Sequence, residues 1–118
     1  MSPSVEVIYK ILVGWSQTTG PQYYKSLSEE YQNMTGQWYE PHGSWDKPLG
    51  EINVRLAEIN APPITVLVFL KGKNEPGGNF WGCADNVPEK PKNDTQRINK
   101  VFEIVKDVKE YHWPANLP

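Results

Sequence analysis

The sequence predicts an α+β domain of three helices, a β-hairpin and a long C-terminal helix. Two observations lead to this fold class. Apolar residues recur every three or four positions in three stretches before residue 60 and in one after residue 93, as on the buried face of helices. Between them, residues 62–70 are almost wholly apolar and rich in β-branched side chains, which is typical of a buried strand.

The length and net charge of the chain limit the classes of protein to which it can belong. With 118 residues, the chain suits one domain with a single core. Its net charge of -2 argues against a protein that coats nucleic acid, because phosphate binding usually leaves a basic footprint. Only two arginines are present, Arg55 and Arg97. The five Trp and six Tyr can fill a core but are also favoured at binding surfaces.

The sequence predicts a cytoplasmic protein with no membrane contact and no cofactor. Cys83 is the only cysteine, which excludes an intramolecular disulfide, and no zinc-site spacing occurs. Residues 1–6 lack the basic and apolar regions of a signal peptide. The longest apolar run, residues 61–70, is too short to cross a bilayer.

Two helices are expected before residue 36. The first is capped by Ser4 and runs to about Gln17, with an apolar stripe of Val5, Ile8, Ile11, Leu12 and Trp15. Gly20 and Pro21 end it. The second runs from about Pro21 to Met34 and stops at Gly36. Its apolar stripe is Tyr24, Leu27, Tyr31 and Met34.

A loop and a third helix follow. Residues 37–46 contain Pro41 and Gly43, which favour a loop. Ser44 or Asp46 is expected to cap a helix that continues to about Asn60. Its amphipathic stripe is Leu49, Ile52, Leu56 and Ile59. The prolines that follow break it, because a residue before proline avoids the helical region.

Residues 64–70 are predicted to be the central strand. Alternate residues from Ile64 to Leu70 lie on one face and Thr65, Leu67 and Phe69 on the other, so both faces should be covered. After a loop at residues 71–78, residues 79–84 are expected to pair back, which gives a hairpin over about 63–84.

The last helix is predicted over about residues 94–112, capped by Asn93 or Asp94. It follows a proline-rich connector and is ended by Trp113 and Pro114. Its expected apolar face is Ile98, Val101, Phe102, Val105 and Val108. Trp113 and Leu117 are expected to lie against the body of the domain.

The order of these elements resembles that of winged-helix domains, with the hairpin as the wing. Four short motifs within residues 22–82 strengthen the resemblance: Tyr-Lys-Ser-Leu-Ser (24–28), Pro-Leu-Gly-Glu-Ile (48–52), Ala-Pro-Pro (61–63) and Pro-Gly-Gly-Asn-Phe-Trp-Gly (76–82). Their layout is similar to the DNA-binding domain of alkyltransferases and alkyltransferase-like proteins, and also to small uncharacterised bacterial and phage proteins.

The resemblance to alkyltransferase-like proteins implies DNA binding without alkyl transfer. In that family a Pro-Cys-His-Arg strand carries the acceptor cysteine, whereas Ile64, Thr65 and Val66 follow Pro63 here. Arg55 is a possible counterpart of the arginine on that family's recognition helix.

Two groups of residues are candidate binding sites. Trp38 and Trp45 either stack on a flat ligand or close one end of the core, and the residues grouped with them are Tyr39, Glu40, His42 and Asp46. The loop after the strand carries Lys71 and Lys73 beside Gly77 and Gly78, followed by Phe80 and Trp81. It either contacts phosphate or is a hairpin turn with edge lysines.

Catalysis has less support. Glu40, His42, Asp46 and Glu51 are the only close group of titratable side chains suited to catalysis, and a metal-dependent nuclease that uses His42, Asp46 and Glu51 is one alternative. Cys83 lies among aromatic residues and is more typical of a small buried side chain than of a nucleophile.

The sequence therefore predicts a non-catalytic recognition module. The residues expected to face the partner are Lys47, Glu51 and Arg55 on the third helix and Lys71, Lys73, Phe80 and Trp81 on the hairpin. The winged-helix order points to nucleic acid. A protein or nucleotide partner, as in a regulatory or host-defence protein of a phage or bacterium, is the alternative. The oligomeric state is left open.

Overall fold

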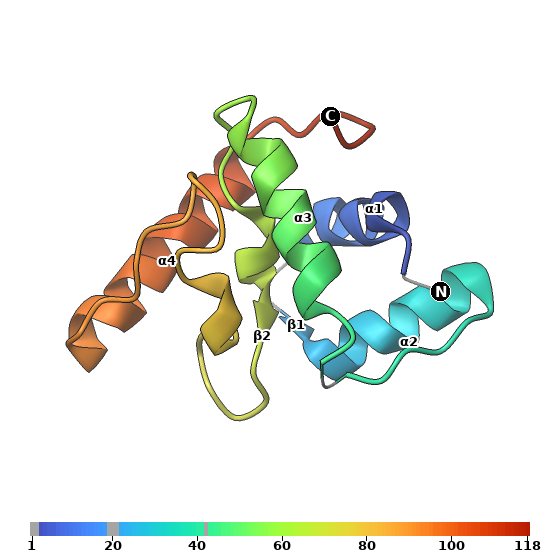
Figure 1. The fold of residues 1–118 in the computed structure, drawn as a ribbon, viewed down its shortest axis with the longest axis horizontal. Coiled ribbons are helices and arrows are strands. Elements are labelled where there is room, and N and C mark those ends of the chain that lie inside the picture. The colour runs from blue at the N-terminus through green and yellow to red at the C-terminus, as the bar shows by residue number, and fades with distance from the viewer. Residues whose placement is uncertain (1–2, 19–21, 42) are drawn as a thin grey trace.

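Helices dominate the structure, a computed structural model that describes residues 3–18, 22–41 and 43–118. The elements in these ranges are α1 (Val5–Ser16), β1 (Gln22–Tyr23), α2 (Tyr24–Thr35), α3 (Asp46–Ala57), the 3₁₀ turn η1 (Ile64–Leu67), β2 (Val68–Phe69), the 3₁₀ turn η2 (Gly78–Phe80) and α4 (Asp94–Glu110) (Figure 1). The radius of gyration is 13.2 Å, close to the roughly 13.5 Å of a compact domain of this length. The fold is a mixed α+β arrangement that is mostly helical.

The segment from η1 to β2 runs through the centre of the molecule (Figure 1). The turn η1 contacts α1, α3 and α4, and every residue from Pro63 to Phe69 is buried. Because helices surround this segment, side chains on all its sides are in the core. The prediction that residues 64–70 hold the core together is confirmed for residues 64–69, whereas Leu70 is half-buried.

The predicted strand is much shorter than expected. Only Val68–Phe69 are extended, while Ile64–Leu67 form a 3₁₀ turn in which the Val66 amide donates to the Pro63 carbonyl over 3.1 Å. A segment buried on all sides is mostly apolar whichever backbone conformation it has, and here Thr65 is the single polar residue among residues 64–69. The alternation of apolar and polar residues therefore could not distinguish a strand from a turn over residues 64–70.

The hairpin over residues 63–84 is not confirmed. Residues 78–80 form the turn η2 instead of a return strand. Within the described residues, the antiparallel contact of β2 is a single bridge between Phe69 and Pro76. Beside it, the Leu70 amide donates a hydrogen bond to the Glu75 carbonyl over 2.9 Å. The regular partner of β2 is β1, which is parallel to it, with Gln22 opposite Val68 and Tyr23 opposite Phe69.

Three of the predicted helix caps are confirmed. The Ser4 hydroxyl accepts a hydrogen bond from the Val7 amide, and the Asn93 side chain accepts from the amides of Thr95 and Gln96. Gly36 ends α2 with a φ of 79°, a left-handed conformation that glycine adopts without strain. The predicted cap of α3 is wrong: Trp45 holds that position, and its side chain makes no capping bond.

Several helix limits and exposed positions differ from the prediction. α2 begins at Tyr24 rather than near Pro21, because Gln22 and Tyr23 pair with β2. α3 ends at Ala57 rather than near Asn60. In place of its last expected helical turn there is a looser turn, in which the Ala61 amide donates a hydrogen bond to the Leu56 carbonyl. Three residues of the predicted apolar stripes are exposed: Met34 (54%), Ile59 (41%) and Phe102 (61%). α4 instead buries Ile104 beside Val101 and Val108.

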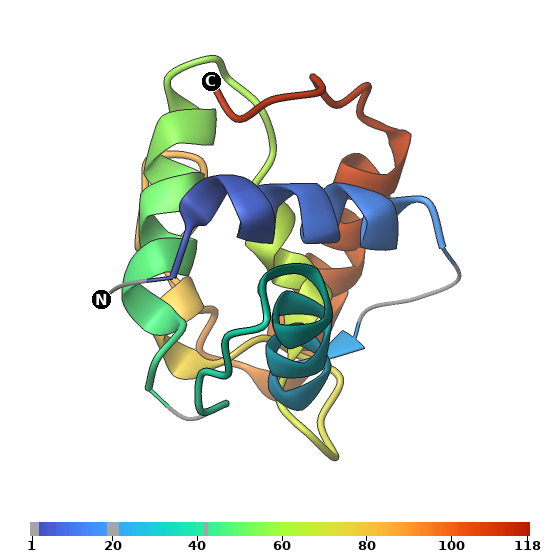
Figure 2. The same ribbon diagram turned by 90° about the vertical axis from the view of Figure 1, so that its right-hand side faces the viewer.

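The C-terminal segment folds back across α1 to the end of α3 (Figure 2). The Tyr9 hydroxyl donates to the Pro114 carbonyl over 2.6 Å, and the Leu117 amide donates to the Glu6 carboxylate over 3.0 Å. Trp113 packs edge-on against Tyr9, and Leu117 is buried, which confirms their predicted contact with the body. Burial, reinforced by the nearby Glu6 charge, raises the pKa of Tyr9 to about 12.

Among the described residues, no helix is both long enough and apolar enough to cross a membrane.

Candidate functional site

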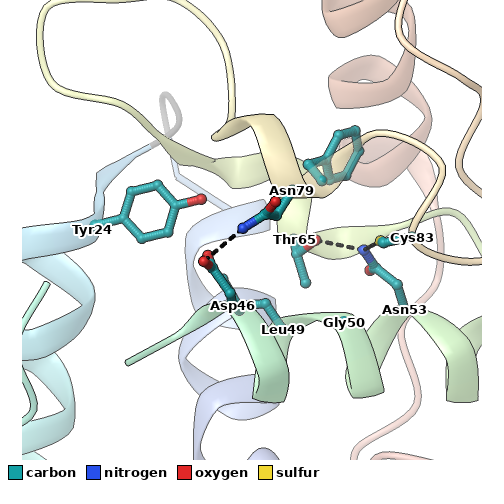
Figure 3. Close-up of a pocket in the computed structure, with 9 residues that line it drawn as sticks. Tyr24, Asp46, Leu49, Gly50, Asn53, Thr65, Asn79 and Cys83 are labelled. Carbon is teal, nitrogen blue, oxygen red and sulfur yellow. Dashed lines mark hydrogen bonds between the residues drawn. The ribbon is translucent and has the colours of Figure 1, made fainter. Parts of the chain in front are cut away.

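Tyr24 lies at the junction of three neighbouring hollows, and these make up the candidate site. We call the first the α2 groove; it is lined by Tyr23, Tyr24, Lys25, Ser26, Glu29, Pro41, Leu70 and Lys71. The second, the inner pocket, lies between α3 and η2 (Figure 3). The third lies under the loop at Gly77 and Gly78, between the start of α3 and Leu70.

The short parallel sheet explains why the α2 groove forms where it does. Tyr24 and Lys25 directly follow β1, and Leu70 and Lys71 directly follow β2. The carboxyl ends of parallel strands meet at the same edge, so these two segments lie together there. In this way, residues almost fifty positions apart in the sequence line one groove.

The α2 groove combines apolar walls with cations. Its volume is about 410 Å³, within the range of about 300–1,000 Å³ usual for small-molecule sites. Tyr23 is 44% exposed. Lys25 and Lys71 are both exposed, and neither forms an ion pair with any acid in the part of the chain that the structure describes. Glu29 is the one carboxylate among the described residues that line the groove.

The inner pocket is small, and both polar and apolar side chains line it (Figure 3). Its volume of about 20 Å³ is close to what one water molecule needs. Asn53 is 1% exposed, and its Nδ2 donates to Thr65 Oγ1 over 2.7 Å and to Cys83 Sγ over 3.4 Å. Asn53 Oδ1 is buried and has no hydrogen-bond partner among the described residues. At the other end, Asn79 Nδ2 donates to Asp46 Oδ2 over 2.8 Å.

Tyr24 connects the hollows and is held in place. The Gly77 amide donates to its hydroxyl over 3.3 Å. A Cβ on Gly77 would lie 2.7 Å from that oxygen, so only glycine allows this approach. Burial raises the pKa of Tyr24, against a smaller lowering by the Gly77 hydrogen bond. The Tyr24 side chain is therefore a neutral, fixed wall at physiological pH.

The lysines of the 71–78 loop are exposed, whereas Arg55 on α3 is bound to another part of the molecule. Lys71, Lys73 and Lys47 are exposed. Lys71 lines the α2 groove. Arg55 Nε instead donates to the Pro118 carbonyl over 2.7 Å, and the Arg55 guanidinium lies 3.7 Å from the Glu51 carboxylate. Arg55 is thus engaged within the molecule.

The predicted aromatic residues do not share one surface. Trp45 is fully buried, and its Nε1 donates to Ser28 Oγ over 3.0 Å. Phe80 is buried at 7% exposure, and Trp81 is half-buried. Trp38 is 42% exposed and bonds to Glu40 in its own loop. Of the two interpretations of Trp45, stacking or core closure, the structure supports core closure.

The predicted titratable cluster can be followed only in part. His42 lies outside the described residues. Asp46 is bound to Asn79, and Glu51 lies beside Arg55. Within the described ranges, no three His, Cys, Asp or Glu side chains come close enough together to hold a metal ion.

Sequence reasoning missed Tyr23, Lys25, Pro41 and Leu70 as possible site residues. The spacing gave no signal for Tyr23, because Tyr23 precedes Leu27 by four positions and Tyr24 precedes Leu27 by three, so both fit the stripe of one helix. Their place in the groove depends on the pairing of β1 with β2.

Comparison with known proteins finds no matching family model, no similar curated protein and no similar solved structure.

Proposed function

We propose that this protein is a non-catalytic recognition module that binds nucleic acid through the α2 groove and the adjoining loop at residues 71–78. The observation that carries the proposal is the placement of Lys25 and Lys71 in one groove, both exposed and both without an acidic partner among the described residues. Unpaired lysines beside apolar walls suit an anion that also has flat apolar parts. Lys73, exposed on the same loop, extends the basic surface.

The winged-helix-like arrangement is part of this proposal. Three helices precede the loop, and the loop occupies the position in the order that a wing has. The contribution of α3 is smaller than its place in that order suggests. Its exposed face carries Glu51 as well as Lys47, the exposed Glu58 directly follows its last residue, and Arg55 is already bound. The loop and the start of α2 therefore supply more of the binding than α3.

Replacing Lys71 and Lys73 together by alanine is expected to weaken binding to a short oligonucleotide about tenfold at low salt. The same variant should reduce the slope of log K against log salt by about one to two, because each phosphate contact releases counterions. Fluorescence anisotropy of a labelled oligonucleotide at several salt concentrations measures both quantities.

The matched control is Lys106→Ala, which removes an exposed lysine from α4. It should change affinity less than twofold. Equal losses for both variants would mean that the charge effect is not localised, and the site would be wrong. The absence of binding to any oligonucleotide at low salt would refute nucleic-acid recognition altogether.

A further inference from the structure

The α2 groove is lined by aromatic and apolar side chains next to cations, and we propose that it holds an unpaired base of a single-stranded nucleic acid. The base would stack on Tyr23, and its phosphates would contact Lys25 and Lys71. This inference rests on the proposed function and adds the class of nucleic acid and the residue that selects it.

The apolar side of the groove is suited to a base. Tyr23 is 44% exposed, although its backbone pairs with β2. The ring is thus held by an ordered backbone while its surface is open. Tyr24, Pro41 and Leu70 line the same groove. Aromatic side chains on a fixed backbone stack on bases with little sequence preference.

The charged side of the groove limits where the phosphates lie. Lys25 follows β1 and Lys71 follows β2, so the cations come from two segments that meet at one edge of the sheet. Glu29 is one helical turn beyond Lys25 on α2. Its carboxylate lies on the same face of α2 as Lys25 and repels phosphate, which disfavours a path of the strand along α2 past Glu29.

A duplex does not fit this arrangement as well as a single strand. In a duplex the faces of the bases are covered by their neighbours, so Tyr23 has no base face to contact unless a nucleotide leaves the stack. The groove volume of about 410 Å³ suits a ligand of small-molecule size rather than a whole helix. The groove therefore favours single strands over duplexes.

The test compares four probes by fluorescence anisotropy: a ten-nucleotide DNA strand, its duplex, an abasic strand of equal length and an acidic peptide. The wild type should bind the strand at least tenfold more tightly than the abasic strand and more tightly than the duplex. Tyr23→Ala should lose this advantage, whereas Tyr23→Phe should keep it within twofold. Phe102→Ala, which removes a side chain that is 61% exposed on α4, is the control and should have no effect.

The possible failures separate the two proposals. If the abasic and base-bearing strands bind with equal affinity, base stacking is refuted and phosphate recognition stands. The same conclusion follows if Tyr23→Ala leaves the affinity unchanged while the Lys71 and Lys73 double variant binds more weakly. Tighter binding of the duplex, or of the acidic peptide, also overturns the inference. A thermal melt of Tyr23→Ala checks its fold, and Tyr23→Leu, which keeps apolar volume without a π-face, provides a second test that should also lose the advantage.

Discussion

Replacing Trp45 by alanine is expected to lower the free energy of unfolding by about 3–5 kcal/mol. Trp45 is fully buried, and its ring centroid lies 5.5 Å from that of Tyr31 and 5.7 Å from that of Tyr39. The change removes these contacts, leaves a cavity and takes the indole donor from the buried Ser28 hydroxyl. Urea denaturation followed by circular dichroism measures the loss.

Two further variants make the Trp45 result specific. Trp45→Phe keeps most of the apolar volume, so it should cost clearly less than the alanine variant. Trp38→Ala removes a tryptophan that is 42% exposed and should cost under about 1 kcal/mol. A Trp45→Ala variant that stays within about 1 kcal/mol of the wild type but no longer binds nucleic acid would show that Trp45 contacts the partner instead.

Leu67→Ala is expected to destabilise the protein by about 2–5 kcal/mol. Leu67 is fully buried in η1, the turn that contacts α1, α3 and α4 at once. Packing from three helices limits how far the surroundings can collapse into the cavity, which places the expected cost in the upper part of that range. The same denaturation experiment measures it.

Met34→Ala is the matched control for Leu67, since it also shortens a long apolar side chain but at 54% exposure. It should cost under about 0.5 kcal/mol. A loss of less than about 1 kcal/mol in Leu67→Ala would contradict the central position of the 64–69 segment.

The helices were predictable because their signals are local. Ser4, Gly36 and Asn93 act as caps through their own side chains or backbone conformation, and each helix buries part of a stripe with helical spacing. The centre was not predictable in detail. Complete burial leaves residues 64–69 apolar at every position except Thr65, so the sequence pattern carries no period that distinguishes a turn from a strand.

The candidate site was predictable only in part, because some of its residues carry a local signal and others are brought together by distant contacts. Lys71 and Lys73 stand out because they begin a loop that ends in two glycines. Tyr23 and Lys25 join that loop through a parallel pairing of β1 with β2, which depends on contacts between distant residues. Whether Trp45 or Arg55 is free also depends on distant partners, Ser28 and Pro118. No spacing along the chain shows these contacts.

The most direct test of the proposed site is to titrate ¹⁵N-labelled protein with the ten-nucleotide single strand and to follow the amide signals by NMR. The proposed site predicts that the largest shifts fall on residues 22–29 and 70–73, on both sides of the α2 groove. Largest shifts on the exposed face of α3 or on α4, with the α2 groove unchanged, would contradict it.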